Sequence, residues 1–170
     1  YEPLFLFSYF AAGALSMPLW VRAVPRFGLA RLWLAGMLLA IAAFVWAATL
    51  SSGSLAGYLA VCLASGLALG ADLALPSALL AGVIQRAGNS GHAEGAYFGW
   101  WNFATKLNLA LAAGLALPLL GAFGYAPGVR DAGALQSLAL AYGLLPCTLK
   151  LLAASLLYVA WMRSPHGEPT

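Results

Sequence analysis

Five long apolar stretches divide this chain of 170 residues. They cover residues 4–21, 32–50, 55–84, 95–123 and 134–162. Each reaches the roughly 18 residues that a transmembrane helix needs, and the last three, with about 30 positions each, suggest tilted helices. Soluble domains carry about 25% charged residues, whereas this chain carries 8% and is 63% hydrophobic. The sequence therefore predicts an all-α membrane protein with five transmembrane helices.

The connectors between these stretches are short and polar. Residues 51–54, 86–92 and 124–131 contain the Gly, Ser, Asn and Pro residues that interrupt helices. None of them is long enough to form a second, soluble domain. We expect one helical bundle over residues 1–163, followed by a short cytoplasmic tail, 164–170.

The basic residues of the connectors indicate the orientation of the bundle. One side carries Arg22, Arg26, Arg31, Arg86 and Arg163, and the other side carries only Arg130. An excess of Lys and Arg marks the cytoplasmic face of a membrane protein. We expect the N-terminus outside and the C-terminus in the cytoplasm, in a bacterial inner membrane. The net charge of +3 is then a topology signal, and we expect no nucleic-acid partner.

The start of the chain predicts that the sequence is part of a longer protein. Residue Tyr1 replaces the usual methionine, and the apolar run begins almost at once. A secretory signal peptide would show a basic segment and a small-residue cleavage site, and neither is present.

Three charged residues are predicted near the middle of the membrane: Asp72, Lys106 and Lys150. At about 1.5 Å per residue, Asp72 lies about 20 Å from the cytoplasmic end of its helix and each lysine about 18 Å. Ionisable residues at such depth are candidates for a functional site. An Asp72–Lys106 ion pair fits the geometry, and its simpler role is to lock two helices together. Lys150 alternatively extends toward water. The three charges sum to +1, which suggests a water-filled cavity or a missing anionic partner.

The fourth stretch has a polar sector beside Lys106. On a helical wheel, Asn102, Thr105 and Lys106 fall within about 100°, and Trp101 lies near them. Amide groups can hydrogen-bond to hydroxyls and an aromatic ring can stack on a sugar, so these residues are candidates for a substrate cavity. The alternative is that Asn and Thr bond between neighbouring helices, as they often do in membranes.

Two further patterns concern helix ends and helix packing. Glu94 opens the fourth stretch, where a carboxylate is favoured by the helix dipole. It either caps the helix or forms a gating contact with Arg86. The third and fourth stretches each contain two glycines four residues apart, Gly66 and Gly70 in one and Gly95 and Gly99 in the other. Such spacing lets helix backbones approach closely.

Enzyme motifs are absent from the sequence. His92-Ala93-Glu94 has the H-x-E form of zinc deaminases, but the second cysteine that should follow Cys147 is replaced by Lys150. Nucleophile-elbow and phosphate-binding loop motifs are absent as well. We expect no enzymatic activity, no metal site and no cofactor.

Residues 76–125 carry a more specific pattern. It consists of Pro76-Ser77-Ala78-Leu79-Leu80-Ala81, Glu94-Gly95, Tyr97-Phe98-Gly99-Trp100-Trp101, Lys106 and Gly124-Tyr125. Lys106 follows Glu94 after eleven intervening residues. This pattern resembles the glycoside–pentoside–hexuronide:cation symporters, the melibiose-permease branch of the major facilitator superfamily. Upstream, the segment from Arg26 to Arg31 is similar to a basic cytoplasmic turn of that superfamily.

The resemblance implies that the chain corresponds to helices 8–12 of the major facilitator fold. It implies a symporter coupled to Na⁺ or H⁺, with a substrate cavity between two halves and with Lys106 near the cation and sugar sites. The family's cation-binding carboxylates belong to the N-terminal half. This chain has Gly82 and Gln85 where the family usually has aspartates.

The leading hypothesis is a secondary active transporter for a sugar or similar polar small molecule. Its partners would be membrane lipid, the N-terminal half of the same transporter and the substrate. The alternative is a small, non-transporting membrane subunit that packs against a partner complex.

Overall fold

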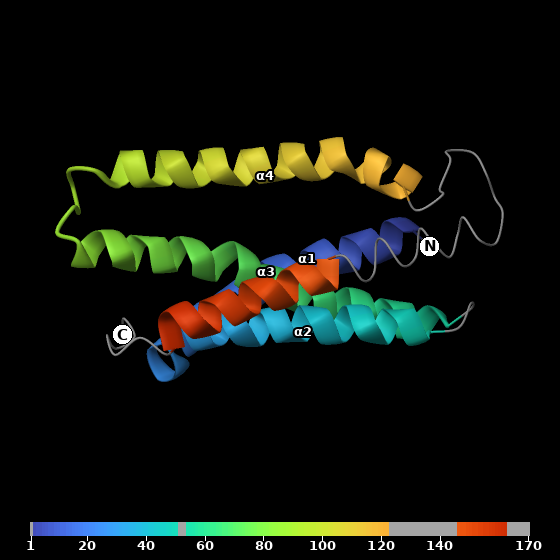
Figure 1. Cartoon of the computed structure of the whole chain (residues 1–170). Helices are drawn as coiled ribbons and strands as arrows, with labels where there is room; N and C mark the ends of the chain where they lie inside the picture. Colours follow the sequence, from blue (N-terminus) through green and yellow to red (C-terminus); the bar gives the residue numbers. More distant parts are fainter. Residues whose placement is uncertain (1, 51–53, 123–145, 163–170) are drawn as a thin grey trace. The chain divides into compact units, whose positions relative to one another are not determined.

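The computed structural model describes residues 2–50, 54–122 and 146–162, and these ranges are helical without any strand (Figure 1). The helices are α1 (Glu2–Phe27), α2 (Leu29–Thr49), α3 (Leu55–Arg86) and α4 (Glu94–Ala122). Residues 146–157 form a further α-helix, which continues as the π-helical turn η1 (Tyr158–Met162). We call residues 146–162 the C-terminal segment. The predicted all-helical class is confirmed.

Three described helices are long and apolar enough to cross a membrane: Pro3–Phe27, Leu29–Ala47 and Leu55–Arg86. Helices α3 and α4 agree with the predicted stretches to within two residues at each end. The first part of the predicted fifth helix, residues 134–145, lies outside the described ranges. So do the connector at 124–131, Arg163 and the tail.

The predicted connector between residues 21 and 32 is wrong. Helix α1 continues to Phe27 and α2 begins at Leu29, so only Gly28 separates them. The apolar run ends at Val21, but Arg is a good helix former and a charge does not stop a helix. Gly28 does stop it, because its φ of 82° and ψ of 152° lie in a region that is essentially restricted to glycine.

The chain divides into two compact units. The first comprises Tyr1–Gly82 and Cys147–Thr170, and the second comprises Val83–Pro146. The described part of the first unit therefore contains α1, α2, most of α3 and the C-terminal segment from Cys147 onward. The second unit contains the last residues of α3, from Val83 to Arg86, and the whole of α4.

Helix α3 packs closely on α1 and α2 inside the first unit. A methyl group added to Gly70 would overlap the Ser16 hydroxyl and lie 2.7 Å from the carbonyl oxygen of Gly13. One added to Gly66 would lie 2.8 Å from Cβ of Ala12. Gly66 and Gly70 therefore allow α3 to approach α1 closely, as glycines four residues apart commonly do in membrane helices.

A small core lies where these helices meet, beside the middle of α3. Its buried members are Leu29, Leu32, Ala71, Leu75 and Leu79, and Trp20 and Trp33 pack against it. Most other large apolar side chains of the described helices are exposed. Exposed apolar side chains suit a surface that faces lipid, in which apolar groups are as well solvated as in a protein core.

In the second unit a defined loop connects α3 to α4. Gly88 has a φ of 71°, and its N–H donates to the carbonyl of Gln85 at 3.1 Å, while the N–H of Asn89 donates to Ile84 at 3.2 Å. This is the Schellman pattern that ends many helices. The Asn89 side chain donates to the Tyr97 hydroxyl at 3.1 Å, which ties the loop to the first turns of α4.

Candidate functional site

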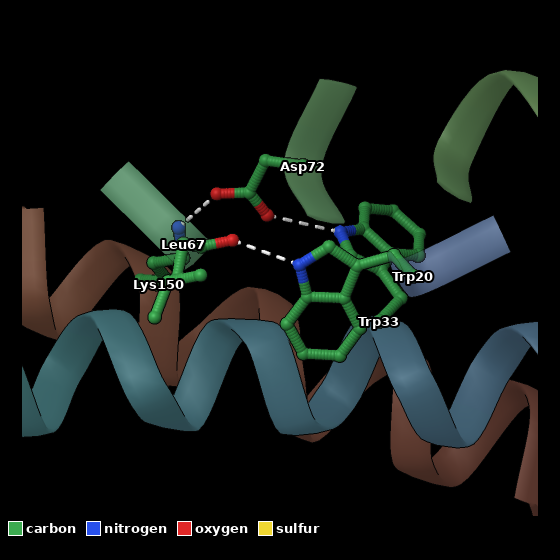
Figure 2. A network of polar contacts seen from close by, with 5 residues as sticks. All are labelled: Trp20, Trp33, Leu67, Asp72 and Lys150. Atoms are coloured by element: carbon green, nitrogen blue, oxygen red, sulfur yellow. Dashed lines mark hydrogen bonds and ion pairs between the residues drawn. The ribbon is translucent and has the colours of Figure 1, made fainter. Parts of the chain in front are cut away.

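The Asp72 carboxylate, in the middle of α3, has partners from two other segments of the first unit. Its Oδ2 forms an ion pair with Nζ of Lys150, which lies in the C-terminal segment. Its Oδ1 accepts a hydrogen bond of 3.1 Å from the indole Nε1 of Trp33 in α2. Figure 2 shows both contacts converging on the one carboxylate. Each oxygen of Asp72 therefore has a partner, and each partner comes from a different helix.

Lys150 reaches Asp72 because it lies on the packed face of the C-terminal segment. Cys147 and Ala154 are buried, and residues three and four apart lie on the same face of a helix. The Lys150 side chain keeps 25% of its surface accessible and that of Asp72 keeps 29%. A charge in apolar surroundings is favourable only when it is paired or wetted. The pair satisfies this requirement and leaves the site electrically neutral.

A second set of polar contacts joins α1 to α3 beside the ion pair. The Leu67 carbonyl accepts hydrogen bonds from Trp20 Nε1 at 2.8 Å and from the buried Ser16 hydroxyl at 3.3 Å. Leu67 precedes Asp72 by five residues, about 7.5 Å along a helix. Both side chains bond to the backbone of α3, so their role is to hold α1 against α3. Tyr9, also in α1, is close enough to Asp72 for its phenol to interact electrostatically with the carboxylate.

The sequence alone did not identify Trp33 as a partner of the site. A signal was nevertheless present, because a buried or half-buried Trp usually finds an acceptor for its N–H. In an apolar helix such as α2 few side chains can accept a hydrogen bond, so the carboxylate of a neighbouring helix is the natural partner. What the sequence could not provide is the helix packing that brings Trp33 to Asp72.

The predicted residues of α4 lie in the second unit. The Asn102 amide donates to the carbonyl of Phe98 at 3.0 Å and the Thr105 hydroxyl to that of Trp101 at 2.8 Å, so both bond within their own helix. Lys106 and Trp101 are exposed, and Lys106 forms no ion pair within residues 83–122. Because Asp72 belongs to the other unit, its pairing with Lys106 stays a prediction.

An open apolar depression lies on the surface of α4. It is lined by Ala96, Gly99, Trp100 and Phe103. The rings of Trp100 and Phe103 meet edge to face with centroids 5.7 Å apart. Trp100 and Phe103, and not Trp101, are the aromatic residues that line this depression.

Glu94 makes a local contact at the start of α4. Its Oε1 accepts a hydrogen bond of 3.2 Å from the backbone N–H of Gly91, three residues earlier. Glu94 is the first residue of α4, so this bond lies in the turn that leads into the helix. The gating contact with Arg86 stays a prediction.

A family model described as MFS/sugar transport protein matches residues 3–161. No curated protein and no solved structure matches the chain. Within the described ranges there is also no group of three or more His, Cys, Asp or Glu side chains that could hold a metal ion.

Proposed function

Because the chain belongs to the family of MFS/sugar transport proteins, we propose that it forms the C-terminal part of a cation-coupled symporter for a sugar or a similar polar small molecule. The observation that carries this proposal is the Asp72–Lys150 ion pair in the middle of an apolar bundle. Intramembrane charges that pair with one another typically mark substrate or ion pathways.

The chemistry of the pair suits a transport site better than a purely structural lock. Replacing a buried ion pair by apolar residues of similar volume is often neutral or stabilising, so stability alone does not explain its presence. A carboxylate and an ammonium can both exchange partners, with each other, with the hydroxyls of a sugar or with a coupling ion. The accessible quarter of each side chain leaves room for such an exchange.

Transport would proceed by alternating access, in which two halves of a transporter rock around a site at the middle of the membrane. In the first unit, Asp72 and Lys150 would contribute to that site. On α4, Lys106, Asn102, Thr105 and Trp101 stay candidates for a substrate cavity. The other side of the site would come from an N-terminal half of the same protein. Na⁺ or H⁺ would be the coupling ion, and the C-terminus would lie in the cytoplasm of a bacterial cell.

Uptake by the complete protein tests this proposal. Purified transporter in proteoliposomes should accumulate a labelled sugar when a Na⁺ or H⁺ gradient is imposed, and Asp72→Asn or Lys150→Ala should abolish accumulation. Ser155→Ala is a matched control, because Ser155 lies five residues beyond Lys150 and its hydroxyl donates to the Leu151 carbonyl of its own helix at 2.8 Å.

Two results would contradict the proposal. Gradient-driven uptake that persists in both charge variants would remove the ion pair from the transport site. A protein that moves no sugar under either gradient, and that purifies in fixed ratio with other membrane proteins, would support the non-transporting subunit.

A further inference from the structure

We infer that Trp33 is the positioning residue of this site, holding the Asp72 carboxylate in one orientation while Lys150 acts as its exchangeable partner. The inference rests on the proposed function, since it assigns roles to the two contacts of Asp72 within a transport cycle. It names a residue of α2, a helix in which the sequence indicated no site residue.

The two contacts of Asp72 differ in kind. Lysine's ammonium is a point charge on a flexible stem and imposes little direction on its partner. The indole of Trp has a single N–H donor in a fixed position on a rigid ring. Trp33 also packs against the buried core around Leu75, which holds the ring in place. The hydrogen bond to Oδ1 therefore fixes which oxygen of Asp72 points to α2 and which points to Lys150.

The charges of the contacts differ as well. Lys150 is the charged group paired with Asp72, and Tyr9 on α1 is a further titratable group that interacts with it. Trp33 carries no charge, so its hydrogen bond does not depend on the presence of Lys150. When Lys150 moves away, Trp33 keeps the carboxylate placed and Oδ2 becomes the oxygen offered to a cation or to a sugar hydroxyl. A fixed carboxylate binds its next partner without the entropy loss of reorienting.

Trp20 provides a matched comparison. It packs against the same core and also donates its N–H to α3, but to the backbone carbonyl of Leu67 and not to a carboxylate. Removing the N–H of Trp20 should therefore affect helix packing alone. Removing that of Trp33 should affect both packing and the function of Asp72.

The test compares Trp33→Phe and Trp20→Phe in the complete transporter, with initial uptake of a labelled sugar normalised to folded protein. For Trp33→Phe we expect a loss of about tenfold or more, the size of a hydrogen bond to a charged group. Trp20→Phe should reduce thermal stability but leave normalised uptake within the scatter of the wild type. Equal uptake in the two variants would overturn the inference. Absence of uptake in the wild type would instead contradict the proposed function.

A second measurement does not depend on transport. In an Asp72→Leu/Lys150→Met background, which lacks the ion pair, Trp33→Phe should lower the unfolding midpoint by less than it does in the wild type, because only its packing loss remains. Trp20→Phe should lower the midpoint by the same amount in both backgrounds. If Trp33→Phe lowers the unfolding midpoint by the same amount in this background as in the wild type, the inference is overturned.

If this background does not fold, replacing Trp33 by benzothienylalanine, in which sulfur takes the place of the N–H, removes the donor while keeping the ring shape. Full normalised uptake by that protein would contradict the positioning role.

Discussion

Lys150 and Asp72, 78 residues apart in the chain, form an ion pair that ties the C-terminal segment to the middle of α3. The contact joins the two parts of the chain that make up the first unit, Tyr1–Gly82 and Cys147–Thr170. It also accounts for two of the three charges that the sequence places deep in the membrane. Lys106 remains as the deep positive charge that forms no ion pair within residues 83–122.

Removing either member of the pair should destabilise the bundle. Lys150→Ala leaves the Asp72 carboxylate without its countercharge, and we expect a loss of about 1–3 kcal/mol, less than for a completely buried pair because about a quarter of each side chain stays accessible. Thermal unfolding in detergent, followed by intrinsic fluorescence, measures the loss. The exchanged variant Asp72→Lys/Lys150→Asp restores opposite charges and should recover part of the midpoint. If the exchanged variant is no more stable than Lys150→Ala, the charges do not stabilise the bundle through each other.

The sequence predicted the described helices well because the length, hydropathy and low charge of a segment largely determine whether it enters a membrane. Helices α3 and α4 begin and end where the apolar runs do, since the loop from Ala87 to Ala93 is polar and rich in glycine. The connector at Gly28 could not be predicted in the same way. There the apolar run ends about six residues before the helix does, because α1 continues beyond Val21 through two arginines, Arg22 and Arg26, which break the apolar run but favour a helix.

The site was predictable in its residue types but not in its pairing. Depth along each helix identified Asp72, Lys106 and Lys150 as functional candidates, and this needs only the rise of a helix. Which lysine faces Asp72 depends on how helices distant in sequence pack around α3. Small residues decide that packing, such as Gly36, where an added methyl group would lie 2.6 Å from Cβ of Ala71. The sequence pattern of one helix does not show which other helix packs against it, so the partner of Asp72 could not be predicted.

Gly28 should be sensitive to any side chain. Its φ of 82° and ψ of 152° are strained for other residues, so Gly28→Ala should destabilise the protein by about 1–3 kcal/mol. Gly114→Ala is the control, because Gly114 lies within α4 and nothing lies within 4 Å of an added methyl group. Unfolding midpoints of the two variants in detergent should separate clearly. Equal midpoints would mean that α1 and α2 can be joined by an ordinary backbone conformation.

The two glycine pairs should respond differently to substitution. Gly70→Ala should destabilise the protein by about 1–3 kcal/mol, the usual range for overpacking, because the added methyl group overlaps the Ser16 hydroxyl. Gly99→Ala should be neutral or slightly stabilising, since nothing lies near the added group and Ala favours a helix over Gly by about 1 kcal/mol. Comparison of the unfolding midpoints checks both. A marked loss for Gly99→Ala would indicate that another helix packs against this face of α4.

Lys106 should matter for transport and not for stability. Its side chain is exposed on α4, and exposed substitutions away from packed features usually change stability by no more than about 0.5 kcal/mol. Lys106→Ala in the complete protein should therefore leave the unfolding midpoint unchanged but abolish cation-coupled uptake in proteoliposomes, because the positive charge would balance a carboxylate of the N-terminal half. Lys106→Arg keeps the charge and should retain part of the uptake. Normal, cation-dependent uptake by Lys106→Ala would exclude this residue from the coupling mechanism and leave Asp72 and Lys150 as the charged residues of the site.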